Sequence, residues 1–460
     1  MSNFLFKLTP QEVPKINTKY RKIVTAVPTP ETIALIKTLD QYESTSMHGQ
    51  IPLAWDHAEG INVFDGQGNQ WLDFTSTIFV ANAGHSNPRI VKALQDLIEK
   101  PLLHSYTYPT RERADYIQYL VKKTPDQFEK AFLLSAGTEA TECALKLMRM
   151  YGQKYGKKRP GILCFENNWH GRTMGAQMLC SNKSQKQWID FEDPNIHHLP
   201  FPYPWREGAV ENPREYFRNH LEKLLEEKKL SADEDFCGIM LETFQGWGAV
   251  FYPKEFVQEI EVFAKEHNLL IAFDEMQAGF GRTGKLFGYQ HYEIEPDLLC
   301  CGKGASSSLP LSFVIGSQEV MDLPDVGSMS STHSANPSSC VAGKANLEAL
   351  LEDGLIENSQ SLGEVFHSKL NKIKERFSQH ISHVLGKGLL AAVHFNTPDG
   401  KPLSNLCDRI CELAMQRGLI LVHTYRESIK MAPPLCISEE ALLEGVEVFE
   451  EVISDCIEKT

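Results

Sequence analysis

Two ionisable side chains stand beside neighbouring apolar segments, where a folded chain could bring them together. Asp274 directly follows the segment LLIAF (269–273), and Lys303 follows the next apolar segment, DLLCC (297–301), between Gly302 and Gly304. If both segments are strands of one open α/β sheet, their carboxyl ends share the edge at which such sheets bind ligands. Burial lowers the pKa of a lysine and makes it a usable nucleophile toward a carbonyl group. Asp274 and Lys303 are therefore candidate catalytic residues, although a lone carboxylate after a strand more commonly caps the next turn.

A third segment could hold a phosphate group. The sequence LLSAGTEATE (133–142) predicts a strand followed by a helix that begins at Gly137 and Thr138. The first N–H groups of a helix have no intrahelical acceptor and bind anions, although an ordinary helix start has the same pattern. Pyridoxal 5′-phosphate (PLP) needs a lysine for its aldehyde, an acid for its ring nitrogen and donors for its phosphate. Together the three segments predict PLP as the cofactor.

The spacing Gly279-x-Gly281-x-x-Gly284 matches the fingerprint of dinucleotide-binding folds, but its context does not. In those folds the first glycine ends the strand and a helix begins beneath the pyrophosphate. Here the residues DEMQA separate LLIAF from Gly279, and the segment KLFGYQHYEIEPD after Gly284 makes a poor helix. An acidic residue is also missing from the end of a second strand about 20 residues further on. We therefore reject a nicotinamide or flavin nucleotide site at these glycines.

Short apolar segments alternate with helix-period segments along most of the chain. The predicted strands are AFLLS (131–135), GILCF (161–165), FCGIMLE (236–242), LLIAF (269–273), DLLCC (297–301) and SFVIG (312–316). Predicted helices at 138–156 and 254–268 lie between them, whereas 195–215 and 323–339 look irregular. This alternation predicts an α/β fold with a mostly parallel central sheet covered on both faces. We expect a large cofactor-binding domain at 75–334 and a smaller α+β domain at 335–460, with 1–74 packing against the smaller one.

Composition excludes several kinds of partner. The 460-residue chain has a formal net charge of −14 and no long basic run, so we expect no nucleic-acid partner. No apolar segment approaches the roughly 20 residues of a membrane span, and the first residues lack a signal-peptide pattern. Eleven cysteines fit reduced thiols, and neither Cys300–Cys301 nor Cys407–Cys411 has the spacing of a zinc site. We expect a cytoplasmic protein without membrane or metal sites.

Six segments, in order and spacing, resemble the class III PLP-dependent aminotransferases of fold type I, such as the ornithine, 4-aminobutyrate and ω-amino acid aminotransferases. The segments are SAGTEATE (135–142), NWHGRTMGA (168–176), DEMQAGFGRTG (274–284), GKG (302–304), STHSANP (331–337) and MAPPL (431–435). The resemblance covers about residues 50 to 445. It implies that Gly279–Gly284 form a loop beyond the cofactor's acid.

The resemblance also implies roles for individual residues. Lys303 would form the Schiff base with PLP and move the proton, and Asp274 would pair with the pyridinium nitrogen. Gln277 would hydrogen-bond the 3-oxygen of the ring, while Gly137 and Thr138 would donate to the phosphate.

Further residues follow from the same resemblance. Trp169 would stack on the ring, at a position where the family usually has Phe or Tyr. Thr332 would reach the phosphate of a neighbouring subunit, which implies a homodimer with its active site at the subunit interface. Glu242 corresponds to an acidic residue near the cofactor.

Two positions depart from family members that use glutamate as amino donor. Those members commonly read QGEGG, whereas this chain has Trp247 in QGWGA, and they carry an arginine where this chain has Lys430 in KMAPPL. A lysine cannot form the bidentate fork that an arginine makes with a carboxylate. Lys430 could still bind a substrate carboxylate, or it could be solvated or pair with a local carboxylate, and both alternatives stay open. Trp247 would add a flat apolar wall to the pocket.

The remaining candidate substrate residues are Arg172, Ile78 and Phe79. Arg172, in HGRT, corresponds to a position that binds a distant substrate carboxylate in several members. Ile78 and Phe79 occupy a segment that is often glycine-rich in the family, so the pocket should be bulkier and drier. We therefore favour an ω-amino or larger amino compound as donor over plain α-amino acid exchange.

Three functions remain open from the sequence. The leading hypothesis is an aminotransferase that passes an amino group to a 2-oxo acid or aldehyde by a ping-pong mechanism. The alternative is racemisation or epimerisation, aminomutation, or decarboxylation-linked transamination on the same scaffold, because fold does not fix function. A binding protein without turnover is the third, and the presence of Lys303 and Asp274 argues against it.

Overall fold

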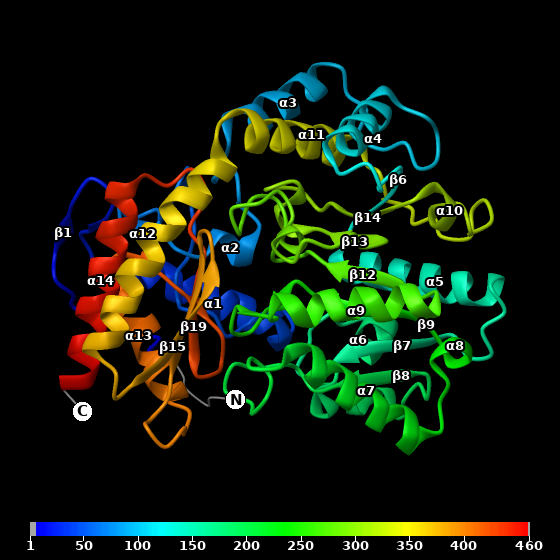
Figure 1. The fold of residues 1–460 in the computed structure, drawn as a ribbon. Coiled ribbons are helices and arrows are strands. Elements are labelled where there is room, and N and C mark those ends of the chain that lie inside the picture. The colour runs from blue at the N-terminus through cyan, green and yellow to red at the C-terminus, as the bar shows by residue number, and fades with distance from the viewer. Residues whose placement is uncertain (1–5, 459–460) are drawn as a thin grey trace.

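A seven-stranded sheet contains all six of the segments predicted as strands. The computed structural model describes residues 6–458 and is shown in Figure 1. In spatial order the strands are β6 (Lys130–Leu134), β14 (Ser312–Gly316), β13 (Leu298–Cys301), β12 (Leu270–Asp274), β9 (Phe236–Glu242), β7 (Gly161–Phe165) and β8 (Ile196–Leu199). Only β14 runs antiparallel to its neighbours in this sheet. The prediction of a mostly parallel central sheet is confirmed.

Helices cover both faces of this sheet, which explains why its strands are apolar throughout. Along β12, Leu270 and Ala272 join the core cluster that includes α5 (Gly137–Lys154). The alternate residues Ile271 and Phe273 join the cluster that includes α9 (Lys254–His267) and α7 (Pro213–Lys228). Since successive side chains of a strand point to opposite faces, each face needs its own apolar residues.

Two segments that look irregular in the sequence contain regular structure. Residues 196–199 form the edge strand β8, which pairs parallel with β7. Helix α7 begins at Pro213 within NPREYF, because a proline is well suited to the first position of a helix, where its N–H would have no partner. Helix α11 (Pro337–Glu352) likewise begins two residues before the end of the 323–339 segment. The prediction of irregular structure was wrong at these positions.

The two ends of the chain form a second group of elements, on the left of Figure 1. Its antiparallel sheet consists of β15 (Ile381–Lys387), β16 (Leu390–Phe395), β19 (Ser428–Met431) and β18 (Val422–His423). Its helices are α12 (Leu355–Arg376), α13 (Ser404–Gln416) and α14 (Glu439–Glu458). A further sheet contains β1 (Ile16–Asn17), β2 (Lys22–Ile23), β5 (Gln70–Asp73), β4 (Asn62–Phe64), β3 (His57–Glu59) and β17 (Leu419–Ile420). Pairing of β17 with β5 joins the first and last parts of the chain, although the boundaries 1–74, 75–334 and 335–460 stay a prediction.

The remaining helices link these groups. At the top of Figure 1, α11 packs against α3 (Pro88–Glu99) and α4 (Arg111–Lys123) and continues toward α12. The others are α1 (Pro30–Tyr42), α2 (Ser76–Phe79), α6 (Met174–Leu179), α8 (Ala232–Asp235) and α10 (Gln318–Met321), and a two-stranded ribbon pairs β10 (Phe244–Gln245) with β11 (Val250–Phe251).

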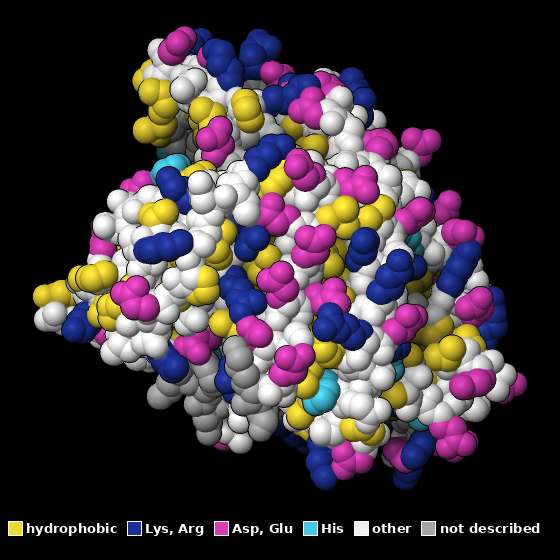
Figure 2. Space-filling model, turned by 90° about the vertical axis from the view of Figure 1, so that its left-hand side faces the viewer, with side chains coloured by type: hydrophobic (Ala, Val, Ile, Leu, Met, Phe, Trp, Pro, Cys, Tyr) yellow, Lys and Arg dark blue, Asp and Glu magenta, His cyan; other side chains and the backbone are white. Residues whose placement is uncertain are grey.

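The net negative charge is spread out on the face drawn in Figure 2. Basic and acidic side chains are interspersed over that face, and hydrophobic side chains gather toward its left and upper edges. Within residues 6–458, no helix is both long enough and apolar enough to cross a membrane.

The buried guanidinium of Arg282 joins the two groups of elements. Its Nη1 donates to Leu389 O at 3.0 Å and Pro433 O at 2.6 Å, both in the part of the chain that follows α12. Its Nη2 donates to Ser76 Oγ at 3.0 Å and Asn82 Oδ1 at 2.7 Å. The side chain is fully buried, and desolvation lowers its pKa to about 9. All four acceptors are neutral oxygens, and the charge of Asp73 nearby acts against the desolvation of the guanidinium.

The glycines around Arg282 serve close packing. Gly281 and Gly284 both have φ of +83°, which side chains rarely tolerate. A Cβ on Gly281 would lie 2.8 Å from a methyl of Leu435, and one on Gly284 would lie 3.0 Å from the Cα of Gln360 in α12. The dinucleotide-like spacing thus lets a loop fit between α12 and the segment after β19.

We expect Arg282→Met to lower the free energy of unfolding by about 3 kcal/mol or more, because it leaves several buried acceptors without donors. Urea unfolding monitored by circular dichroism measures this loss. Arg214→Met is the matched control, because Arg214 is half exposed in its ion pair with Glu259 and should cost about 1 kcal/mol or less. Equal losses in the two variants would contradict the role given to Arg282.

Candidate active site

A cavity of about 160 Å³ opens at the carboxyl ends of β9 and β12 and beside the residues that follow β13. This is the edge at which open α/β sheets bind ligands. Seven residues singled out in the sequence line it: Gly137, Thr138, Trp169, Glu242, Asp274, Gln277 and Lys303. The other lining residues are His170, Gly171, Thr243, Phe244, Met276 and Ala278.

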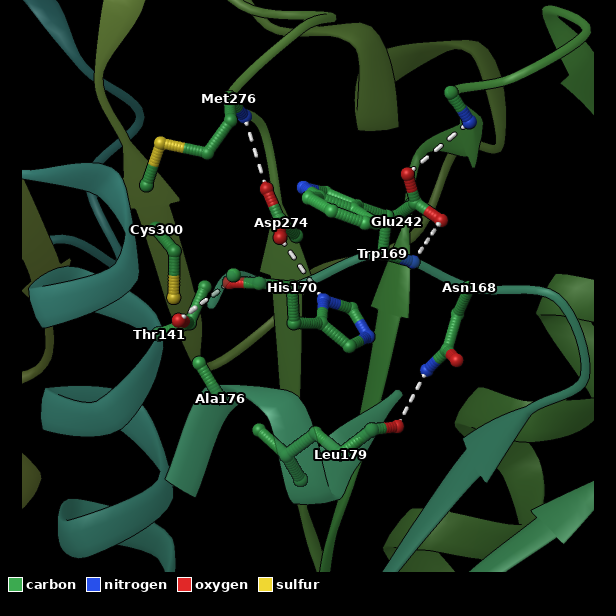
Figure 3. Close-up of polar contacts among 12 residues, drawn as sticks. Thr141, Asn168, Trp169, His170, Ala176, Leu179, Glu242, Asp274, Met276 and Cys300 are labelled. Atoms are coloured by element: carbon green, nitrogen blue, oxygen red, sulfur yellow. Dashed lines mark hydrogen bonds and ion pairs between the residues drawn. The ribbon is translucent and has the colours of Figure 1, made fainter. Parts of the chain in front are cut away.

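Asp274 is held in place from two sides (Figure 3). Its Oδ1 accepts from Met276 N at 3.1 Å, and its Oδ2 lies 2.9 Å from His170 Nδ1. Asp274 and His170 are both almost fully buried. A carboxylate fixed in this way can face a protonated ring nitrogen without swinging away from it. His170 was not among the predicted site residues, since nothing in the spacing of NWHGRT shows that it reaches a side chain 104 positions away.

Lys303 lies on the turn that follows β13, with φ of +45°. Burial lowers the pKa of its amine, while the charges of Asp274 and Glu242 act in the opposite direction. Gly302 before it packs against Met276, whose Sδ would lie 2.6 Å from a Cβ at that position. A buried lysine with a lowered pKa is suited to bond with an aldehyde.

The start of α5 provides anion donors to the cavity. Glu139 turns back so that its Oε2 accepts from Ser135 N and Ala136 N, at 2.9 and 2.8 Å. The N–H groups of Gly137 and Thr138 are thus left as donors at the helix start, which is a place where phosphate groups bind. Gly171 lies against this helix start with φ of +145°, and a Cβ there would lie 2.3 Å from Thr138 Oγ1.

Glu242 ends β9 and faces two backbone donors. Its Oε2 accepts from Trp169 N at 3.0 Å and its Oε1 from Gly246 N at 3.1 Å (Figure 3). Burial, together with the nearby charge of Asp274, raises the pKa of Glu242 to about 8 despite these hydrogen bonds. Glu242 therefore holds Trp169 and the 245–249 turn in position rather than entering the cavity as a free charge.

Lys430 reaches the cavity region from the smaller sheet. Its Nζ donates to Gly246 O at 2.6 Å and to Gln277 Oε1 at 3.2 Å, and lies 4.6 Å from the ring centre of Phe79. Lys430 is buried, and desolvation followed by the charge of Lys303 lowers its pKa to about 7. Of the sequence alternatives, a solvated lysine is wrong, and the two neighbours that accept its hydrogen bonds are neutral.

Trp247 turns away from the cavity lining. Its Nε1 donates to Gln245 Oε1 at 3.0 Å, and the guanidinium of Arg426 lies 3.8 Å from its ring centre. His394 packs edge-on against it at 5.3 Å. At the position where the glutamate of QGEGG stands in glutamate-using members, this chain thus has an aromatic ring that packs against a cation.

The other predicted substrate residues lie around the cavity without lining it. Arg172 is exposed, with its guanidinium 4.5 Å from the ring centre of Trp169. Ile78 is 39% exposed and Phe79 is buried. Both belong to α2, in which all four residues from Ser76 to Phe79 have φ between +46° and +69°. A run of left-handed residues without glycine is strained, and β-branched Thr77 and Ile78 are the least tolerant of it.

Thr332 lies apart from the cavity of its own chain. It is exposed in the segment before α11, and its carbonyl oxygen lies 3.0 Å from His104 Nε2. Exposed apolar side chains of Leu102, Leu103, Tyr106 and Tyr108 belong to the segment that contains His104.

Glu242 gives the stability of the cofactor-free protein a defined pH dependence. Its folded pKa of about 8 lies above the ordinary value of 4.5, so between those values the folded protein binds more protons than the unfolded chain. Stability contributed by this group therefore falls as pH rises from about 4.5 to 8. We expect Glu242→Gln, which mimics the protonated acid, to unfold in urea like the parent at pH 5 and to be the more stable protein at pH 8. Parallel pH profiles for the two proteins would contradict this.

The residues around the cavity fit PLP. A buried lysine, a carboxylate fixed by a histidine, a helix start for phosphate and an indole face are gathered about one space. No group of three or more His, Cys, Asp or Glu side chains placed to hold a metal occurs in the described range 6–458.

Comparisons with known proteins agree. The family "Aminotransferase class-III" matches residues 44–453. An alanine/serine racemase of Pyrococcus horikoshii is 32% identical over 98% of this chain and 96% of its own length. An ornithine aminotransferase of Saccharomyces cerevisiae is 32% identical over 93% of this chain and 99% of its own length.

A solved structure confirms the predicted fold. An aminotransferase of Bacillus anthracis superposes with a TM-score of 0.84 at 22% identity, covering 94% of this chain and 100% of its own. The expected fold type I arrangement, a large domain on a mostly parallel sheet with a smaller α+β part, is confirmed by this similarity. With a family match that spans most of its length, the chain belongs to the class III aminotransferases, and PLP is its cofactor.

Proposed function

We propose that the chain transfers the amino group of an ω-amino compound, whose amine lies far from its carboxylate, to a 2-oxo acid or aldehyde. This proposal rests on the ammonium of Lys430, which already donates hydrogen bonds to two oxygens of the protein. It stands where glutamate-using members have a carboxylate-binding arginine, yet its donors are directed to Gly246 O and Gln277 Oε1. Arg172, exposed beside Trp169, is the better placed cation for a carboxylate distant from the reacting amine.

Different residues of the chain have different roles in the proposed reaction. PLP, when bound, supplies an aldehyde that takes up the amino group and a ring that accepts electrons. Lys303 would hold PLP at its aldehyde and would move the proton of the donor, because burial lowers the pKa of its amine and favours the neutral form. Asp274, fixed by His170, would keep the ring nitrogen protonated, and Gln277 would donate to the 3-oxygen. Gly137 and Thr138 would donate to the phosphate, and Trp169 would stack on the ring.

The substrate side is narrower than in glycine-rich members. Phe79 is buried beneath Lys430, and Ile78 is partly exposed beside it. Trp247 carries Arg426 on its ring and lies outside the cavity lining, so it adds no carboxylate there. These side chains favour an extended donor with an apolar middle.

The active unit is a homodimer in this proposal. Thr332 is exposed and distant from the lining of its own cavity, as expected for a residue that reaches the phosphate of a neighbour. The exposed apolar residues Leu102, Leu103, Tyr106 and Tyr108 supply a surface for association. All eleven cysteines are free thiols, which supports a cytoplasmic location.

Racemisation is the second candidate, because a protein named as an alanine/serine racemase matches nearly the whole chain. The changed residues at Trp247 and Lys430 are compatible with it. The two reactions differ in one respect that can be measured: transamination consumes the donor's amino group, and racemisation only inverts its carbon centre.

The test follows the absorbance of the PLP-loaded protein while single amine donors are added without an acceptor. We expect the yellow band to bleach with ω-amino acids and to persist with glutamate. Arg172→Met should raise the concentration of ω-amino acid needed for bleaching about tenfold, because it removes a charged hydrogen-bond donor, and should leave amines without a carboxylate unaffected. A band that persists while L-alanine loses optical purity would replace the proposal by racemisation, and bleaching by glutamate alone would overturn the donor class.

A further inference from the structure

Lys430 is unusual among the residues around the cavity, because it comes from the smaller sheet. Its backbone pairs with Ala392 of β16 and Val422 of β18. From that sheet its side chain extends to Gln277, which follows β12 of the large sheet. Lys430 as a whole residue is 6% exposed. Its ammonium lies next to Gly246 O, Gln277 Oε1 and the ring of Phe79.

A lysine at this place determines which end of the Gln277 amide faces the cofactor. In its charged form the lysine has three donors and no acceptor, so it then holds only the oxygen of a neighbouring amide. Oε1 is therefore turned toward Lys430, and the NH2 group is left as a donor for another acceptor. Without the lysine, the amide could rotate and present its oxygen instead.

Gly246 completes this arrangement. Its carbonyl oxygen accepts a hydrogen bond from Lys430 Nζ, and a Cβ on Gly246 would lie 2.1 Å from Gln277 Nε2. The amide nitrogen therefore passes directly over the Cα of Gly246. Gln277 lines the cavity with Asp274 and Lys303, so its amide borders the space in which the ring of PLP would lie.

We propose that Lys430 is a positioning residue, which fixes the side-chain amide of Gln277 so that its nitrogen donates to the 3-oxygen of PLP. The lysine thus replaces the family arginine in sequence but acts on the cofactor side of the pocket. This inference rests on the role proposed above for Gln277. It also explains why a residue at a substrate-binding position has two neutral oxygens of the protein as its partners.

A double-mutant cycle on the affinity for PLP tests the inference without turnover. The dissociation constant of added PLP is measured by quenching of tryptophan fluorescence in protein freed of cofactor, for the parent, Lys430→Met, Gln277→Met and the double variant. Each single variant should weaken binding about tenfold, and the double variant should be no weaker than the weaker single one, because both remove the same hydrogen bond. The absorbance maximum of bound PLP should shift in Lys430→Met and Gln277→Met alike.

Two further variants serve as controls. Lys387→Met removes an exposed lysine at the end of β15, in the same sheet as Lys430, and should leave the affinity unchanged. Lys430→Gln keeps an N–H donor for Gln277 Oε1 and should recover part of the affinity, which a variant that merely failed to fold would not do.

Additive losses in the cycle would overturn the inference. So would an unchanged affinity in Lys430→Met together with a raised KM only for donors that carry a carboxylate, since that pattern belongs to a substrate clamp. The proposed reaction is judged separately, because the double-mutant cycle on PLP affinity can be measured equally well in a protein that binds PLP and racemises its substrate. A parent protein that binds no PLP overturns both.

Discussion

The buried guanidinium of Arg282 is the interaction on which the arrangement of the site depends. Three segments that are distant in sequence meet at its two terminal nitrogens, namely residues 76–82, the turn before β16 and the proline pair after β19. A charge without a carboxylate acceptor is expensive to bury, and only correctly placed oxygens make the burial tolerable. The smaller sheet is therefore held at one distance from the large one, and that distance lets Lys430 reach Gln277.

Of four ionisable side chains at the cavity, three are held by hydrogen bonds within the protein and the fourth is left reactive. Asp274 is held by His170, Glu242 by two backbone N–H groups and Lys430 by two neutral oxygens. Burial and the proximity of like charges raise the pKa of Glu242 to about 8 and lower that of Lys430 to about 7. Lys303 has its pKa lowered by the same burial, and within residues 6–458 its amine forms no hydrogen bond. The amine of Lys303 is thus available to a partner from outside the chain.

Much of this could be predicted from sequence because it depends on local patterns. The strand ends at Asp274 and Glu242 follow from uninterrupted apolar segments, and the phosphate site follows from a strand that leads into a helix at Gly137. The role of His170 could not be predicted in this way, because it depends on the packing of β12 against a loop 104 residues earlier. Edge strand β8 was missed for a related reason: IHHL has too little apolar surface to stand out, and its pairing with β7 supplies the missing stabilisation. The partners of Lys430 could not be predicted either, since two sheets had to be placed relative to one another first.

Helix α2 shows how that placement produces a pocket wall. Left-handed conformations cost about 1–2 kcal/mol per residue, so a turn from Ser76 to Phe79 would not persist alone. It is held because Ser76 Oγ accepts from Arg282 and donates to Ala432 O, while Thr75 Oγ1 accepts from Thr77 N. Strain of this kind is found where surrounding contacts fix a functional geometry. Here the geometry brings the ring of Phe79 to 4.6 Å from the ammonium of Lys430, where its π-face favours a cation. Contacts between the two sheets therefore set both the cofactor side of the pocket, through Gln277, and the substrate side, through Phe79.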